Sequence, residues 1–140
     1  MTQTVFHIPT NGSGLYEFTP DVVQFVKSAK VESGLLTLFV RHTSCSLLIS
    51  ENADPDVKLD MDDFFARLVP DADHMDMRWL RHICEGPDDM PAHIKAALTP
   101  VSLSIPISNG RPVLGTWQGI YLFEHRTRAH QRQVVGHISA

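Results

Sequence analysis

Alternating apolar and polar positions predict β-strands near both ends of the chain and in its first third. Residues 101–107, VSLSIPI, place four apolar side chains on one face and two serines on the other. The sequence SNGRP follows at residues 108–112 and predicts a hairpin turn. Residues 34–42, GLLTLFVRH, are apolar enough to predict a central strand. The predicted strands cover residues 2–8, 34–42, 101–107, 117–125 and 131–139.

Two other segments have helical spacing and recognisable ends. In the first, Thr19 is a predicted N-cap with a proline directly after it, and Gly34 lies past the end. Its apolar stripe comprises Val22, Val26 and Ala29. The second begins after Asp54 and is stopped by Pro70. Its apolar stripe comprises Val57, Met61, Phe64, Phe65 and Leu68. A short third helix is expected over residues 91–98, after an acidic, loop-like segment.

The element pattern predicts an α+β fold. Strands outnumber helices, so we expect a compact, β-sandwich-like single domain over residues 1–140, with two or three helices on one side. A chain of 140 residues buries enough surface to fold without disulfides or a structural metal.

Charge and composition narrow the class of partner. The net charge of −4 argues against a nucleic-acid-binding protein, which usually presents a basic face. The small basic cluster of Arg126, Arg128 and Arg132 would suit one phosphorylated metabolite. No apolar run reaches the length of a membrane span, no signal peptide is visible, and the two cysteines lack metal-like spacing. We therefore expect a cytoplasmic protein that binds neither membranes nor nucleic acids.

Three histidines in polar settings are the first candidates for chemistry. His42 ends a predicted strand, His82 lies in the acidic loop and His93 lies in the short helix, with Glu85 and Asp89 nearby. Imidazole and carboxylate groups together can bind a divalent ion such as zinc, and they are also the groups that act in general acid–base catalysis. No HEXXH or paired CXXC motif is present, so spacing alone leaves a metal site and ordinary hydrogen-bonded histidines both open.

Two further motifs each allow two interpretations. The run HTSCS, residues 42–46, offers hydroxyl and N–H groups that can hold an anion, or a turn that satisfies its own backbone. Cys45 within it is more simply a small buried residue than a nucleophile. In GTWQG, residues 115–119, Gln118 can contact a polar ligand, whereas packing is the simpler role for Trp117.

Three ordered blocks together resemble the YjbQ/UPF0047 family, whose members are often named secondary thiamine-phosphate synthase enzymes. The blocks are HTSCSLLISENADPDV, RHICEGPDDMPAHIK and LGTWQGIYLFEHR. The resemblance runs over nearly the whole chain. It implies an α+β sandwich that assembles as a homotrimer, and one polar pocket built from all three blocks. It also implies a weak activity that joins hydroxymethylpyrimidine diphosphate to thiazole phosphate.

The resemblance carries site roles onto positions of this chain. The residues expected to be catalytic are His42, His82, Glu85, Asp89 and His93. The same three histidines are the expected ligands of a divalent metal, zinc or magnesium. The residues that the resemblance implies for substrate binding are Thr43, Ser44, Ser46, Asn52, Trp117, Gln118 and Glu124, and the basic cluster adds Arg128 as an expected phosphate contact. The chain departs from the family after Glu124, where HRTRAHQR replaces a shorter turn, and this bears on the arginine assignments.

Three functions fit these expectations. The first is an enzyme that acts on a small phosphorylated metabolite and can catalyse thiamine-phosphate formation as one of its reactions. The second is a histidine-dependent metallohydrolase, and the third is a metabolite-binding trimer without catalysis. Zinc that copurifies with the protein would favour the second function.

Overall fold

Two antiparallel sheets and three α-helices make up the computed structural model, which describes residues 2–140. The larger sheet has the strand order β1-β8-β3-β5-β6, and the smaller has the order β2-β7-β4. The larger sheet comprises β1 (Gln3–Asn11), β8 (Ala129–Ser139), β3 (Ser33–Val40), β5 (Ser102–Ser108) and β6 (Arg111–Pro112). The smaller comprises β2 (Gly14–Glu17), β7 (Gln118–Glu124) and β4 (Cys45–Glu51). The predicted α+β class is confirmed.

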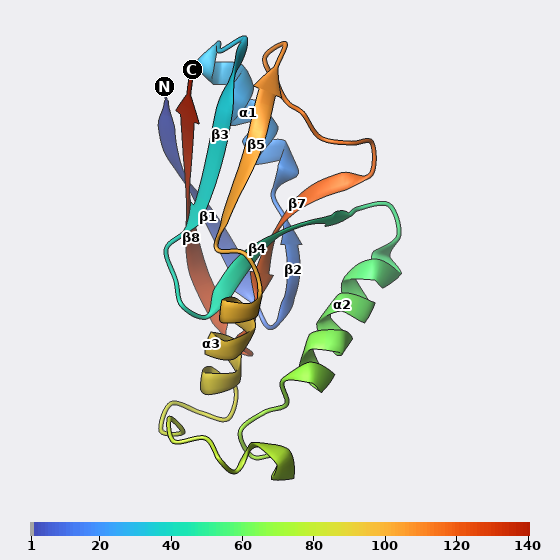
Figure 1. The fold of residues 1–140 in the computed structure, drawn as a ribbon, viewed down its shortest axis with the longest axis vertical. Helices are drawn as coiled ribbons and strands as arrows, with labels where there is room; N and C mark the ends of the chain where they lie inside the picture. The colour runs from blue at the N-terminus through green and yellow to red at the C-terminus, as the bar shows by residue number, and fades with distance from the viewer. Residues whose placement is uncertain (1) are drawn as a thin grey trace.

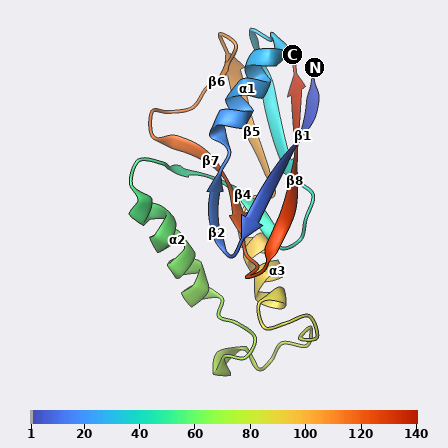
Figure 2. The same ribbon diagram turned by 180° about the vertical axis from the view of Figure 1, so that it is seen from behind.

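The helices are α1 (Thr19–Ala29), α2 (Pro55–Leu68) and α3 (Asp89–Leu98), with a short 3₁₀ turn at Met75–Met77. Helix α1 lies along the larger sheet, whereas α2 projects from the body beside the smaller one (Figures 1 and 2). The start of α3 and the end of α2 meet the segment 69–88 at one end of the molecule. No helix among the described residues is long and apolar enough to cross a membrane.

The main core lies between the sheets and α1. Leu36 and Leu38 of β3 are fully buried there, as are Leu47 of β4 and Ile120 of β7. Strand β7 is buried on both faces, because its alternate residues Tyr121 and Phe123 pack under α2. This arrangement explains why the sequence of β7 is nearly continuous in apolar residues.

Several local predictions were wrong. Residues 45–51 form strand β4, which was not among the predicted strands. Thr19 is not the N-cap of α1, because Phe18 takes that position and the Thr19 hydroxyl bonds Glu17 and the Ile120 N–H.

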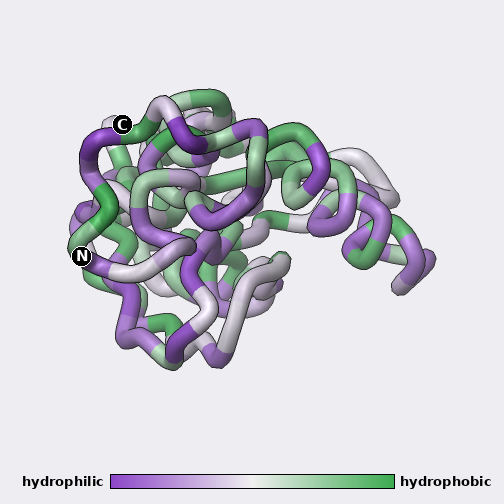
Figure 3. Tube along the Cα trace, turned by 90° about the horizontal axis from the view of Figure 1, so that it is seen from below, coloured by the Kyte–Doolittle hydropathy of each residue, from purple (hydrophilic) through white to green (hydrophobic). Residues whose placement is uncertain are grey.

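The predicted apolar stripe of α2 is also only partly packed. No residue of α2 is fully buried, and only Met61 and Phe65 of that stripe pack against the small cluster under the helix. Phe64 and Leu68 stay exposed. In Figure 3 this projecting helix carries both hydrophobic and hydrophilic stretches. The helix begins after Asp54 as predicted, and Asp54 is its N-cap, accepting a hydrogen bond from the Asp56 N–H at 2.9 Å.

Candidate metal centre

Two histidines and one aspartate converge where α3 begins. Asp89 and His93 stand one turn apart on α3, and His82 comes from the preceding loop. One carboxylate oxygen of Asp89, Oδ2, lies 2.9 Å from Nε2 of His82 and 3.3 Å from Nε2 of His93. The three potential ligand atoms all lie within 4.8 Å of one another. The sequence predicted that His42, His82 and His93 would converge, whereas the structure brings His82 and His93 together with Asp89 in place of His42.

A backbone carbonyl sets the orientation of His93. Its Nδ1 lies 2.9 Å from the carbonyl oxygen of Thr43. A carbonyl oxygen can only accept, so Nδ1 carries a proton, and Nε2 is the ring nitrogen that faces Asp89. Metal-binding histidines are anchored in this way, with the second nitrogen donating to a carbonyl or carboxylate.

Arg126 holds the carboxylate of Asp89 in place. Its Nη1 donates to Oδ1 of Asp89 at 2.7 Å, and its Nε donates to Oδ2 of Asp88 at 2.9 Å. Thr127 donates to Asp88 as well, from its N–H and its hydroxyl. Asp89 is only 3% exposed, so the paired guanidinium compensates a carboxylate that burial would otherwise penalise. The other oxygen of Asp89 is left facing the two histidines.

The charges of the cluster are coupled. Hydrogen bonds to Asp89 and then to Glu85 raise the pKa of His82 above its ordinary value. Burial by itself would raise the pKa of Asp89, but the bond from His82 and the nearby charges of His93 and Arg126 lower it. Without a ligand, these shifts favour a protonated His82 paired with an ionised Asp89.

These donors fit a divalent transition metal. Two imidazole nitrogens and one carboxylate oxygen are a ligand set of catalytic zinc sites, which keep a fourth position open. Magnesium prefers oxygen ligands, so the imidazoles favour zinc or a similar ion. Glu85 is well exposed, and its Oε2 lies 3.1 Å from Nε2 of His82. It is therefore placed to act as an additional ligand or as a base.

His42 lies beside this cluster rather than in it. Its Nε2 accepts a hydrogen bond of 2.9 Å from the N–H of Gln133, so that nitrogen is already used. Burial, and then the charge of Arg132, lower its pKa. His42 and His93 nevertheless line the same surface hollow, of about 350 Å³. His42 can face a ligand there without binding the ion.

A second hollow has His82 of the cluster in its lining. It has a volume of about 390 Å³ and is lined by Trp79, Leu80, Arg81, His82 and Met90. The hollow thus combines an exposed aromatic ring with a guanidinium beside a predicted metal ligand. Sequence reasoning missed Trp79 and Arg81 because the segment 71–88 has no regular pattern, so nothing predicted which of its side chains gather.

Ser44, Ser46 and Glu124, all expected to bind substrate, are buried in the domain. Glu124 accepts bonds from Arg132 and from the hydroxyl of Thr10, and Arg132 also donates to Ser44. Burial opposes ionisation of Glu124, but the bond from Arg132 lowers its pKa. Glu124, Arg132, Thr10 and Ser44 thus form one buried network, whereas Ser46 bonds Thr99 and His125.

The three arginines that are close in the sequence have different surroundings in the structure. Arg126 is bound to Asp88 and Asp89, and Arg132 is bound to Glu124. Arg128 is exposed and makes no ion pair with residues 2–140. Of the three, only Arg128 keeps a guanidinium available to a phosphorylated ligand.

The prediction that Cys45 is a buried residue is confirmed, whereas the prediction for Trp117 is not. Burial raises the pKa of Cys45 to about 12, in agreement with a buried residue and not a nucleophile. Trp117 is 63% exposed, so the prediction that it packs in the interior was wrong.

The TWQ block lies far from the metal cluster within one chain. In the β4–β7 ladder Cys45 pairs with Glu124, and Glu51 pairs with Gln118 six residues along. At about 3.3 Å per residue, the two ends of the ladder are roughly 20 Å apart. Trp117, Gln118 and Asn52 lie at the far end, where Asn52 bonds Glu17 and Gln118 bonds the Gly115 N–H. A single chain does not unite the three blocks in one pocket.

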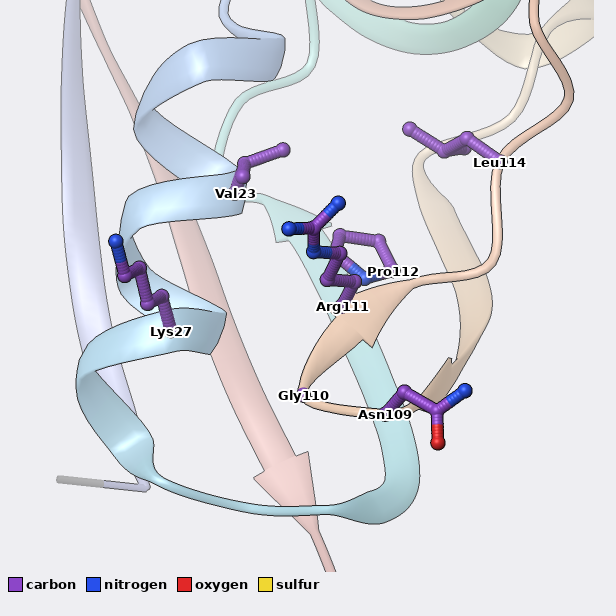
Figure 4. A pocket seen from close by; sticks show the side chains of 7 residues that line it. All are labelled: Val23, Lys27, Asn109, Gly110, Arg111, Pro112 and Leu114. Carbon is purple, nitrogen blue, oxygen red and sulfur yellow. The ribbon is translucent and has the colours of Figure 1, made fainter.

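Another cavity, of about 650 Å³, lies between α1 and the turn that joins β5 to β6. Figure 4 shows Val23 and Leu114 facing this space from opposite sides, with the guanidinium of Arg111 between them. None of the predicted site residues lines it. Its size alone identifies no chemistry, so the residues that converge around Asp89 define the stronger candidate site.

Comparisons with known proteins agree on one family. The family model described as UPF0047 protein YjbQ-like matches residues 4–140. The UPF0047 protein sll1880 of Synechocystis is 54% identical over 137 residues, covering 98% of this chain and 90% of that protein. The UPF0047 protein YjbQ of Escherichia coli O157:H7 is 40% identical over 134 residues, covering 95% and 94%.

Solved structures show the same fold. A conserved YjbQ/UPF0047 family protein from Clostridium acetobutylicum aligns with a TM-score of 0.81 at 31% identity, covering 97% of this chain and 99% of that one. The conserved hypothetical protein TT1486 from Thermus thermophilus aligns with a TM-score of 0.79 at 33% identity and the same coverage. The resemblance drawn from the three sequence blocks is thereby confirmed at the level of the family.

Proposed function

The chain belongs to the UPF0047 YjbQ-like family, and from that premise we propose that it is a divalent-metal-dependent enzyme acting on a small phosphorylated metabolite. The observation that carries the proposal is the convergence of His82, Asp89 and His93 on one point, with His93 anchored and Asp89 locked in place. A bound zinc ion would supply Lewis-acid stabilisation of developing phosphate charge. Such preorganised charge is often the largest contribution to catalysis.

The surroundings support a phosphorylated, ring-containing substrate. Trp79 offers an aromatic face beside the cluster, and Arg81 and Arg128 offer guanidinium groups that match phosphate oxygens. The family resemblance suggests thiamine-phosphate formation as one such reaction. In it, the pyrimidine methyl carbon bonds to the thiazole nitrogen while pyrophosphate leaves. We place the enzyme in the cytoplasm with both cysteines reduced.

A metallohydrolase is the second candidate, and Glu85 favours it. This exposed carboxylate stands beside His82 at the edge of the cluster, where it can take a proton from an attacking water. Hydrolysis and pyrophosphate displacement would use the same ion and differ in the nucleophile.

Metal analysis of the purified protein tests the proposal. We expect close to one zinc ion per chain after purification without added metal. His93→Ala and Asp89→Asn should lose it, while the exposed His7→Ala retains it. Activity is then measured with the pyrimidine diphosphate plus thiazole phosphate, and with the diphosphate alone. Coupled product indicates the transferase, phosphate release alone indicates the hydrolase, and metal-free protein that is fully active would refute the proposal.

Arg128→Ala provides a test of substrate binding. The side chain is exposed and makes no ion pair with residues 2–140, so its loss should leave the melting temperature unchanged. Losing one bidentate phosphate contact should weaken binding of a phosphorylated ligand by about tenfold, as measured by calorimetry. Unchanged affinity would assign Arg128 to the solvated surface.

A further inference from the structure

Lys95 occupies a core position of α3. The buried residues of this helix include Ala92, Lys95 and Ala96, a spacing that defines its inward face. Lys95 is only 8% exposed, whereas the other three lysines, Lys27, Lys30 and Lys58, are exposed. A buried ammonium group is costly unless something pairs with it.

No side chain among residues 2–140 pairs with Lys95. No hydrogen bond or ion pair reaches its ammonium group, although Asp62, Asp71 and Asp88 attract it from a greater distance. No enclosed side-chain nitrogen of the described residues lacks a partner, so this group must meet open space. The ammonium is therefore available to a ligand.

The open space is a cavity of about 300 Å³ between the end of α2, the segment after it and α3. Besides Lys95, its lining consists of Ala66, Val69, Pro70, Asp71, Asp73 and His74. The lining thus combines three apolar residues with two aspartates, a histidine and a lysine. None of the three metal-cluster residues lines this cavity.

We propose that this cavity binds a small zwitterion, of which a free α-amino acid is the simplest example. The ligand carboxylate pairs with Lys95, and the ligand ammonium group lies against Asp71 and Asp73. A simple anion would satisfy Lys95 but would meet the two aspartates, and a simple cation would leave Lys95 unpaired. The three apolar residues suit a short aliphatic side chain, and the volume is at the lower end for ligand pockets. The site is separate from the proposed metal centre.

Calorimetry with three matched probes tests this site in the full-length protein. L-Alanine carries both charges, propionate only the carboxylate and ethylamine only the ammonium group. We expect alanine to bind at least about tenfold more tightly than either single-charge probe. Equal or weaker binding of alanine, or no binding, would overturn the proposal.

Variants show whether the binding belongs to this cavity. Lys95→Met and the double variant Asp71→Asn, Asp73→Asn should each weaken alanine binding by about tenfold or more. The exposed α2 variants Lys58→Met and Asp60→Asn should leave it unchanged. The two aspartates are exposed, so the double variant keeps the test decisive where Lys95→Met does not fold. Unchanged alanine affinity in the double variant would overturn the proposal.

Discussion

At the scale of single residues, Arg126 gives two adjacent aspartates different roles. It binds one oxygen of Asp89 and leaves the other facing the histidines, while Asp88 ties the guanidinium to Thr127. Arg126→Gln should therefore reduce zinc affinity by about 10–100-fold, because a misplaced ligand costs binding even when it remains present. Competition with a chromophoric chelator measures this effect.

Matched variants separate positioning from general destabilisation. Arg126→Lys should recover only part of the affinity, since an ammonium group cannot bridge both aspartates with a planar fork. Arg128→Gln, on an exposed neighbour, should bind zinc like the parent protein. Parental zinc affinity in Arg126→Gln would contradict the positioning role.

His125 predicts how the fold responds to acid. Burial, and then the charge of Lys95, lower its pKa from 6.5 to about 3, and its Nε2 lies 2.9 Å from the Ser46 hydroxyl. The unfolded chain binds this proton below about pH 6.5, but the folded one does not until pH falls to about 3. The contribution of neutral His125 to the free energy of unfolding is therefore fully present above about pH 6.5. Up to about 5 kcal/mol of it is lost as the pH falls to about 3.

Chemical denaturation between about pH 4 and 6 tests this prediction. The free energy of unfolding should fall more steeply with acid in the parent than in His125→Gln, by up to about 1.4 kcal/mol per pH unit. His7→Gln, on an exposed histidine, should keep the parental slope. Equal slopes in the parent and His125→Gln would contradict the prediction.

At the scale of elements, α2 is held by few contacts. Phe65 packs edge-on against Phe123 with ring centres 5.2 Å apart, while most of the helix faces outward. Phe65→Ala should lower the free energy of unfolding by about 2–3 kcal/mol, below the cost of a fully buried phenylalanine because Phe65 is partly exposed. Asp63→Ala on the outer face should change it by less than about 0.5 kcal/mol. Similar small effects from both variants would show that α2 is not anchored by Phe65.

At the scale of the whole molecule, the exposed apolar side chains argue for assembly. Leu59, Phe64 and Leu68 of α2 are more than half exposed, as is Trp117. Exposed apolar patches of this kind commonly mark protein–protein interfaces. The split between the metal cluster and the TWQ block would also be resolved if neighbouring chains supplied one part each.

The exposed apolar side chains predict assembly and the family resemblance implies three chains, so we predict a homotrimer with its pockets at or near subunit interfaces. Three chains joined by identical head-to-tail contacts would form a closed ring. Sedimentation velocity at micromolar concentration should therefore give a single species of three times the chain mass. Phe64→Glu with Leu68→Glu should shift it toward monomer while the far-ultraviolet circular dichroism is retained. A parent protein that sediments as a monomer would contradict the prediction.

The sequence by itself determined the fold class, the family and much of the local structure. Alternation along β5 and β8 and the Asp54 cap of α2 depend on neighbours a few residues apart, so their pattern is visible in the chain. The histidine and carboxylate types made a divalent-ion site one of two open interpretations before any geometry was known.

Only the tertiary structure decided which of these groups meet. It joined His82 to His93, left His42 with the Gln133 N–H, and bound Arg126 and Arg132 to buried carboxylates. These outcomes depend on side chains from distant segments competing for the same partners. Periodicity reports which face of an element is apolar, whereas the pairing of buried charges follows from the packing of separate elements in three dimensions.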